Sequence, residues 1–146
     1  MNLKDAVEKA AKIAGNDYFL VSAFVELGKN AWTLMFYRQT DNTIIDFKVE
    51  NDVEKGEVQD ASFGEGFKKL DIDAINIEHL TALETAKASL KAKPTATYMS
   101  LTTKNGKAVW NISFILPDVS AAIYEIDAKT GAIVKQEKFS LFTKIK

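Results

Sequence analysis

An internal repeat is the feature that most constrains the fold of this chain. Trp32 and Trp110 lie 78 residues apart, each within a stretch of alternating apolar residues, 31–36 and 109–114. Downstream, residues 47–50 resemble residues 124–127 at a spacing of 77, and the glycines that follow, Gly56 and Gly131, are 75 apart. Because order and spacing agree at three places, we expect two copies of one unit, at residues 1–60 and 78–146, with a joining segment at 61–77.

Each copy opens with an Ala- and Lys-rich segment of helical period. Asn2 as N-cap and Gly15 as a stop predict a first helix over about residues 3–14. Its apolar positions recur at three- and four-residue spacing: Leu3, Ala6, Val7, Ala10 and Ile13. The second helix is expected to begin after Thr81, which has capping-box spacing with Glu84, and to end before Pro94. Such alanine-lined faces suit close packing on a sheet.

Alternating apolar residues predict strands in the rest of each copy. Residues 45–49 and 108–116 show the clearest period of two, and Asn105-Gly106 between two strand patterns predicts a tight hairpin. Residues 127–131 are expected to form the turn before a fourth strand, since Asp127 can accept backbone hydrogen bonds and Gly131 can take positive φ. Each unit therefore reads as a helix followed by three strands and a short fourth, an α+β arrangement.

The joining segment is too apolar to be a solvated linker. Phe63, Phe67, Leu70 and Ile72 predict that it lies along the body, covering an edge or bridging the copies. Gly64 and Gly66 in the same segment lack the spacing of a phosphate-binding loop, so we interpret residues 64–69 as a turn.

Composition and residue types exclude several classes of function. Nineteen Lys and Arg against twenty Asp and Glu leave a net charge of −1, which argues against nucleic acid as a partner. With no Cys and one His, the usual zinc ligand sets cannot form, and the acidic residues 71–78 lack the spacing of a calcium loop. His79 is interpreted as a solvated surface residue rather than a general base. We predict no catalytic, cofactor or metal site, and no enzyme activity.

The ends of the chain show no targeting signal. The first fifteen residues lack an apolar core behind a basic start, and the longest apolar run, residues 18–25, is far below the roughly 20 residues of a membrane span. The chain as given is expected to be cytoplasmic, or extracytoplasmic if a leader has been removed.

Four residues of the second copy are candidates for binding. Trp110 and Tyr124 lie on apolar strand patterns, where a core anchor is the first interpretation and the wall of a ligand pocket the second. Val109 and Ile115 alternate with the apolar face, so they form an exposed strip if the second face of their strand is wet. The alternative is that the other copy covers them.

The second copy resembles the PepSY (peptidase propeptide) family. The residues that carry the resemblance are 110–114 and the hairpin 122–134, preceded by the helix at residues 80–91. The first copy is similar but degenerate, because residues 51–56 replace the tight Asp-Ala-x-Thr-Gly turn. The resemblance implies two cystatin-like repeats, each a helix against an antiparallel sheet, in one compact α+β chain. It also implies a non-catalytic role in restraining or docking a peptidase.

These inferences lead to two expected functions. The first is a non-catalytic module that binds a protein partner, such as a peptidase, through a sheet edge or an exposed strand face. The alternative is a small-molecule-binding protein or enzyme with a pocket between helix and curved sheet, lined by Trp110, Phe114 and Tyr124. A homodimer joined through sheet edges is a third option.

Overall fold

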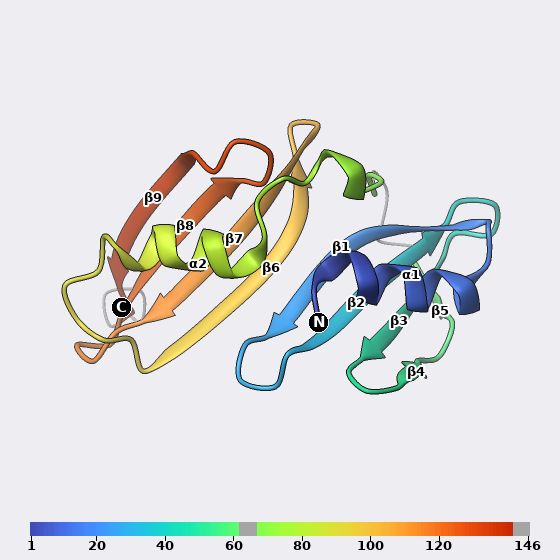
Figure 1. Cartoon of the computed structure of the whole chain (residues 1–146), viewed down its shortest axis with the longest axis horizontal. Helices are drawn as coiled ribbons and strands as arrows, with labels where there is room; N and C mark the ends of the chain where they lie inside the picture. Colours follow the sequence, from blue (N-terminus) through green and yellow to red (C-terminus); the bar gives the residue numbers. More distant parts are fainter. Residues whose placement is uncertain (62–66, 142–146) are drawn as a thin grey trace.

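The computed structural model describes residues 1–61 and 67–141, and the fold it shows is α+β. Two helices lie on one face of a nine-stranded antiparallel sheet (Figure 1). Residues 64–66 of the turn predicted over residues 64–69 lie outside the described residues, as does Phe63, and residues 67–69 lie in neither a turn nor a helix or strand. No helix within the described ranges is long and apolar enough to cross a membrane.

The N-terminal half is a helix followed by a meander of strands. Helix α1 (Leu3–Ala14) begins at Asn2, whose side chain accepts a hydrogen bond from the Asp5 amide, and stops at Gly15, as predicted. The strands that follow are β1 (Tyr18–Glu26), β2 (Ala31–Arg38), β3 (Thr43–Val49), β4 (Val53–Lys55) and β5 (Gln59–Asp60). Ile13, expected on the buried face of α1, is 48% exposed, because Ala14 rather than Ile13 faces the core in the last turn of the helix.

The C-terminal half has the same order of elements. Helix α2 (His79–Lys87) precedes β6 (Ala96–Lys104), β7 (Lys107–Ile115), β8 (Ser120–Asp127) and β9 (Ile133–Ser140). The predicted capping box at Thr81 is wrong: α2 starts three residues earlier than expected, and its N-cap, Glu78, makes no side-chain capping bond. The fourth strand, expected to be short, spans eight residues.

The two meanders share one sheet in the order β4-β3-β2-β1-β6-β7-β8-β9, and β5 pairs with β3. The first strands of the halves, β1 and β6, are thus antiparallel neighbours at the centre. The predicted turns have the expected geometry: Asn105 and Gly106 take positive φ between β6 and β7, and Asp127 Oδ1 accepts from the amides of Lys129 and Thr130.

The joining segment contacts both halves. Phe67 packs against Tyr37 on the sheet face without helices, whereas Leu70 is buried in the main core beneath the helices. The amide of Leu70 donates to the Leu20 carbonyl of β1, and the amide of Ile77 donates to the Ala128 carbonyl after β8. The segment therefore passes from one face of the sheet to the other and ends beside α2.

Candidate functional site

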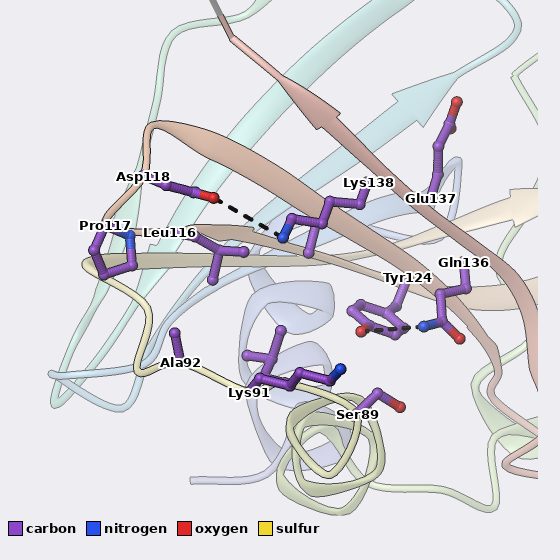
Figure 2. A pocket seen from close by; sticks show the side chains of 12 residues that line it. Ser89, Lys91, Ala92, Leu116, Pro117, Asp118, Tyr124, Gln136, Glu137 and Lys138 are labelled. Atoms are coloured by element: carbon purple, nitrogen blue, oxygen red, sulfur yellow. Dashed lines mark hydrogen bonds and ion pairs between the residues drawn. The ribbon is translucent and has the colours of Figure 1, made fainter.

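A groove on the helix face of the C-terminal half is the strongest candidate site. It has a volume of about 720 Å³ and lies between the chain after α2 and the outer strands β8 and β9 (Figure 2). Helix α2 packs chiefly on β7, so the chain that follows it, residues 88–95, must return past the uncovered ends of β8 and β9. The groove is the space left by that return path.

Apolar atoms form the floor of the groove and polar side chains form its walls. Tyr124 and Ala122 of β8 and Leu116 after β7 lie at the bottom, where each is part of the main core. Gln136 and Lys138 project from β9 on one side, and the side chains of residues 89–92 lie on the other (Figure 2). Gln136 Nε2 donates to the Tyr124 hydroxyl at 3.5 Å. An apolar floor with a few polar groups is typical of binding sites.

One end of the groove carries an acid held in its charged form. The Asp118 carboxylate accepts hydrogen bonds from the Ser120 hydroxyl and amide, and Lys138 Nζ lies 4.0 Å from it. These bonds to Ser120, followed by the charge of Lys138, hold the pKa of Asp118 below its usual value. The rim of the groove therefore presents an ionised carboxylate and an ammonium group at neutral pH.

Val119, next to this acid, is held in a left-handed backbone conformation. Its φ is 59°, a region that costs a β-branched residue about 1–2 kcal/mol, and its side chain is 41% exposed. The turn is fixed by the Leu116 amide bond to the Ser120 carbonyl and by the Val119 amide bond to the Leu116 carbonyl. Strain of this kind is concentrated at functional sites.

Strand β9 closes one side of the groove and is also the last strand of the sheet. Its residues 133–138 are exposed, and within the described part of the chain no strand pairs with its outer edge. An edge strand of this length can accept a further strand through its backbone groups. The groove and this edge are adjacent, so one extended segment can reach both.

The structure places two of the candidate binding residues inside the core. Trp110 is 1% exposed, and its indole Nε1 donates to the Ile77 carbonyl at 2.8 Å. Tyr124 is 2% exposed, packs edge-on against Phe114, and reaches the groove floor. The expected ligand pocket lined by Trp110, Phe114 and Tyr124 together is thus a packed helix–sheet interior, in which Tyr124 alone of the three lines the groove.

Val109 and Ile115 lie on the sheet face without helices. Val109 is 4% exposed, so it does not form part of the exposed apolar strip that was expected if this face of the sheet were solvated. Its surroundings are Lys104, Glu125 and Lys135 rather than the N-terminal half, and the salt bridge of Lys104 Nζ to Glu125 Oε1, at 2.7 Å, lies beside it. Ile115 is half-buried.

His79 is not the solvated surface residue that the sequence suggested. It is 8% exposed, because its ring lies 4.9 Å from the Trp32 ring and 6.3 Å from the Trp110 ring. Burial lowers the pKa of its imidazole, the neighbouring charge of Glu78 opposes this, and the amino group of Met1 adds to it. Within the described ranges, no group of three or more His, Cys, Asp or Glu side chains could hold a metal ion.

The sequence analysis missed the residues that wall the groove. Residues 89–92, Gln136 and Lys138 carry no catalytic or ligand motif. The available signal was the length of the segment between the second helix and the next strand, which is longer than the segment after the first helix.

The region that contains the groove matches a known protein family. Residues 80–137 match the family described as "Peptidase propeptide and YPEB domain", or PepSY. The C-terminal half contains a PepSY domain. All the groove residues except Lys138 fall within the matched PepSY range. A search of curated proteins found no match.

A solved structure shares the fold of nearly the whole chain. It is a crystal structure from Clostridium difficile 630 described as a "putative lipoprotein", with a TM-score of 0.73 and 20% sequence identity. The similarity covers 95% of this chain and 93% of that chain, so the two proteins share the fold of both halves.

Proposed function

We propose that this protein is a non-catalytic module that binds an extended segment of a protein partner at the groove and the adjoining edge of β9. The observation that carries the proposal is the position of an apolar-floored groove directly beside an exposed edge strand. A bound segment would add a strand to β9 and place a side chain over Tyr124 and Ala122. The strained turn at Val119 supports the same location.

A peptidase is the partner class that the family match supports. The matched family is described as a peptidase propeptide, and a non-catalytic module of this kind fits a role in restraining or docking a peptidase. The similarity to a structure described as a lipoprotein supports an extracytoplasmic location for that encounter.

The residue ranges 1–60 and 78–146 are proposed as two copies of one unit, joined by residues 61–77. Two equivalent hydrogen bonds support this division. Trp32 Nε1 donates to the Met1 carbonyl at 3.1 Å and Trp110 Nε1 to the Ile77 carbonyl, in each case two residues before the start of a helix. Only the second copy carries the groove proposed as the binding surface.

The test is inhibition of a panel of peptidases by the protein and by two tryptophan variants. Ala92→Trp fills the groove, whereas Lys93→Trp adds the same side chain at an exposed neighbouring position that does not line it. We expect the unmodified chain to slow at least one peptidase, Ala92→Trp to weaken this tenfold or more, about 1.4 kcal/mol, and Lys93→Trp to leave it unchanged. If the chain slows none, or both variants behave alike, the proposal fails.

The volume of the groove, about 720 Å³, also favours a second candidate, a small ligand that packs on the apolar floor and hydrogen-bonds the Tyr124 hydroxyl. Tyr124→Phe would then weaken binding of the small molecule and leave peptidase inhibition unchanged. Light scattering at two protein concentrations tests the remaining candidate, a homodimer through β9 edges: a mass that doubles with concentration supports it.

A further inference from the structure

The contact between the two halves is narrow. Strands β1 and β6 pair only over residues 23–25 with residues 99–101, against nine residue pairs between β6 and β7. The joining segment, a cluster of three aromatic rings and a hydrophobic core shared by both halves complete the contact. A change in free energy at this junction therefore acts on the one strand pairing that joins the halves within the described part of the chain.

His79 is the centre of that aromatic cluster. Its ring contacts Trp32 from the N-terminal half and Trp110 from the C-terminal half, and the two indole rings lie 6.3 Å apart. The imidazole thus fills the space between the halves, and it is the one imidazole in the chain. Its ring nitrogens make no hydrogen bond to any residue that the structure describes, and neither nitrogen is fully enclosed.

The surroundings of His79 disfavour a proton on its ring. It is the first residue of α2, where the positive end of the helix dipole lies. The charged groups around it are Glu78 on its own helix, Asp73 from the short helix before it (Ile72–Ala74), and Lys4 and the Met1 amino group from the start of α1. Burial and the Met1 amino group lower the pKa of His79, and Glu78 opposes them.

We propose that His79 makes the junction between the halves acid-sensitive, because protonation places a charge on a largely buried ring that is packed between two indoles. The junction is closed around a neutral ring at pH 7. As the pH falls below about 6.5, the ordinary value for His, an opened or unfolded junction takes up the proton more readily than the closed one. Acid therefore favours opening of the junction. Raising the pH above 7 does not change the stability of the junction through His79, because the ring is already neutral.

Two measurements on the full chain test the proposal. The first is an NMR titration of the imidazole, for which we expect a midpoint below 6.5. The second is amide hydrogen exchange, corrected for the intrinsic effect of pH. Between pH 7 and pH 5 we expect faster exchange at residues 23–25 and 99–101, with unchanged exchange at the β7–β8 pairs around Ile112.

His79→Phe, which keeps an aromatic ring but cannot titrate, is expected to lose the acid-dependent part of the exchange. His79→Gln replaces it if the phenylalanine variant does not fold. A titration midpoint at or above 6.5, as a favourable indole–imidazolium contact would give, overturns the proposal. So does acid-induced exchange that persists in the variant or that rises equally in all strands.

Discussion

The two halves of the sheet have the same order of elements but leave different surfaces open. In the N-terminal half, α1 spans 12 residues, contacts β1 to β4, and is followed by β1 after residues 15–17. In the C-terminal half, α2 spans nine residues, packs chiefly on β7, and is followed by residues 88–95 before β6 begins. The longer helix covers its meander, and the shorter one leaves β9 exposed and a groove over Ala122 and Tyr124 of β8.

The outer strands of the two halves, β4 and β9, differ in length and exposure. Strand β4 has three residues, and its Val53 packs against the core, whereas β9 has eight residues and exposes Ile133–Lys138. One unit thus ends in a short edge that offers little to a partner, and the other ends in a long edge beside a groove. The difference teaches that the groove and the open edge, which we propose as a binding surface, arise from the lengths of a helix and a strand.

The largest expected effect concerns the two buried tryptophans. Trp32→Ala and Trp110→Ala each remove a fully buried indole and its hydrogen bond to a backbone carbonyl, so we expect a loss of about 3–5 kcal/mol in either case. Urea unfolding measures both. Equal losses support equivalent positions in the two halves, and a loss below 1 kcal/mol at either position would break the equivalence.

A smaller effect is expected at the alanines through which the helices approach the sheet. Ala10 of α1 and Ala86 of α2 are both fully buried, so a leucine at either site overpacks the interface by about 1–3 kcal/mol. We expect the cost of Ala86→Leu to be the smaller, because α2 can shift toward the open groove. Thermal unfolding decides this, and a larger cost at Ala86 would contradict the comparison.

The turns before β3 and β8 allow a matched pair of substitutions whose expected effects on stability have opposite signs. Asn42 and Val119 both take positive φ, 54° and 59°, but asparagine tolerates this conformation and valine does not. Val119→Asn is expected to stabilise the protein by about 1 kcal/mol, and Asn42→Val to destabilise it by about 1–2 kcal/mol. Denaturant midpoints of the two variants measure the effects; destabilisation by Val119→Asn would show that the turn is not strained.

The smallest effect concerns acid near pH 4. Asp127 accepts the amides of Lys129 and Thr130, which lower its pKa, whereas in the N-terminal turn an amide of Glu50 donates to the Asp52 backbone carbonyl. The Asp127 bonds stabilise the fold above the ordinary pKa of Asp and are lost as the pH falls through the lowered value. Asp127→Asn should therefore flatten the dependence of Tm on pH between 4 and 2. An unchanged slope would contradict the assignment.

Most of the fold could be predicted because local signals agreed with it. Asn2, Gly15, Asn105-Gly106 and Asp127 each fix a cap or turn by their own chemistry, and the strand periods follow from one buried face. The prediction was wrong at the start of α2 and at His79 for one reason. The ring of His79 packs against Trp32 and Trp110, which are distant in the sequence. No local sequence pattern predicts such a contact.

The candidate site could be predicted only in part. Tyr124 was chosen from its strand pattern and does reach the groove, but the walls come from residues 89–92 and from β9, which share no motif. The position of the groove depends on where α2 begins and ends, and the first residue of α2 was predicted wrongly. Trp110 and Val109 were chosen for the same apolar character that buries them.

The most direct test of the binding surface is an NMR map of the protein bound to a peptidase that it slows. The account predicts that amide shifts change at Ser89–Ala92, at Gln136 and at neighbouring residues of β9, with α1 and β2 unaffected. Changes confined to α1, or to the sheet face that carries Val109 and Ile115, would contradict it.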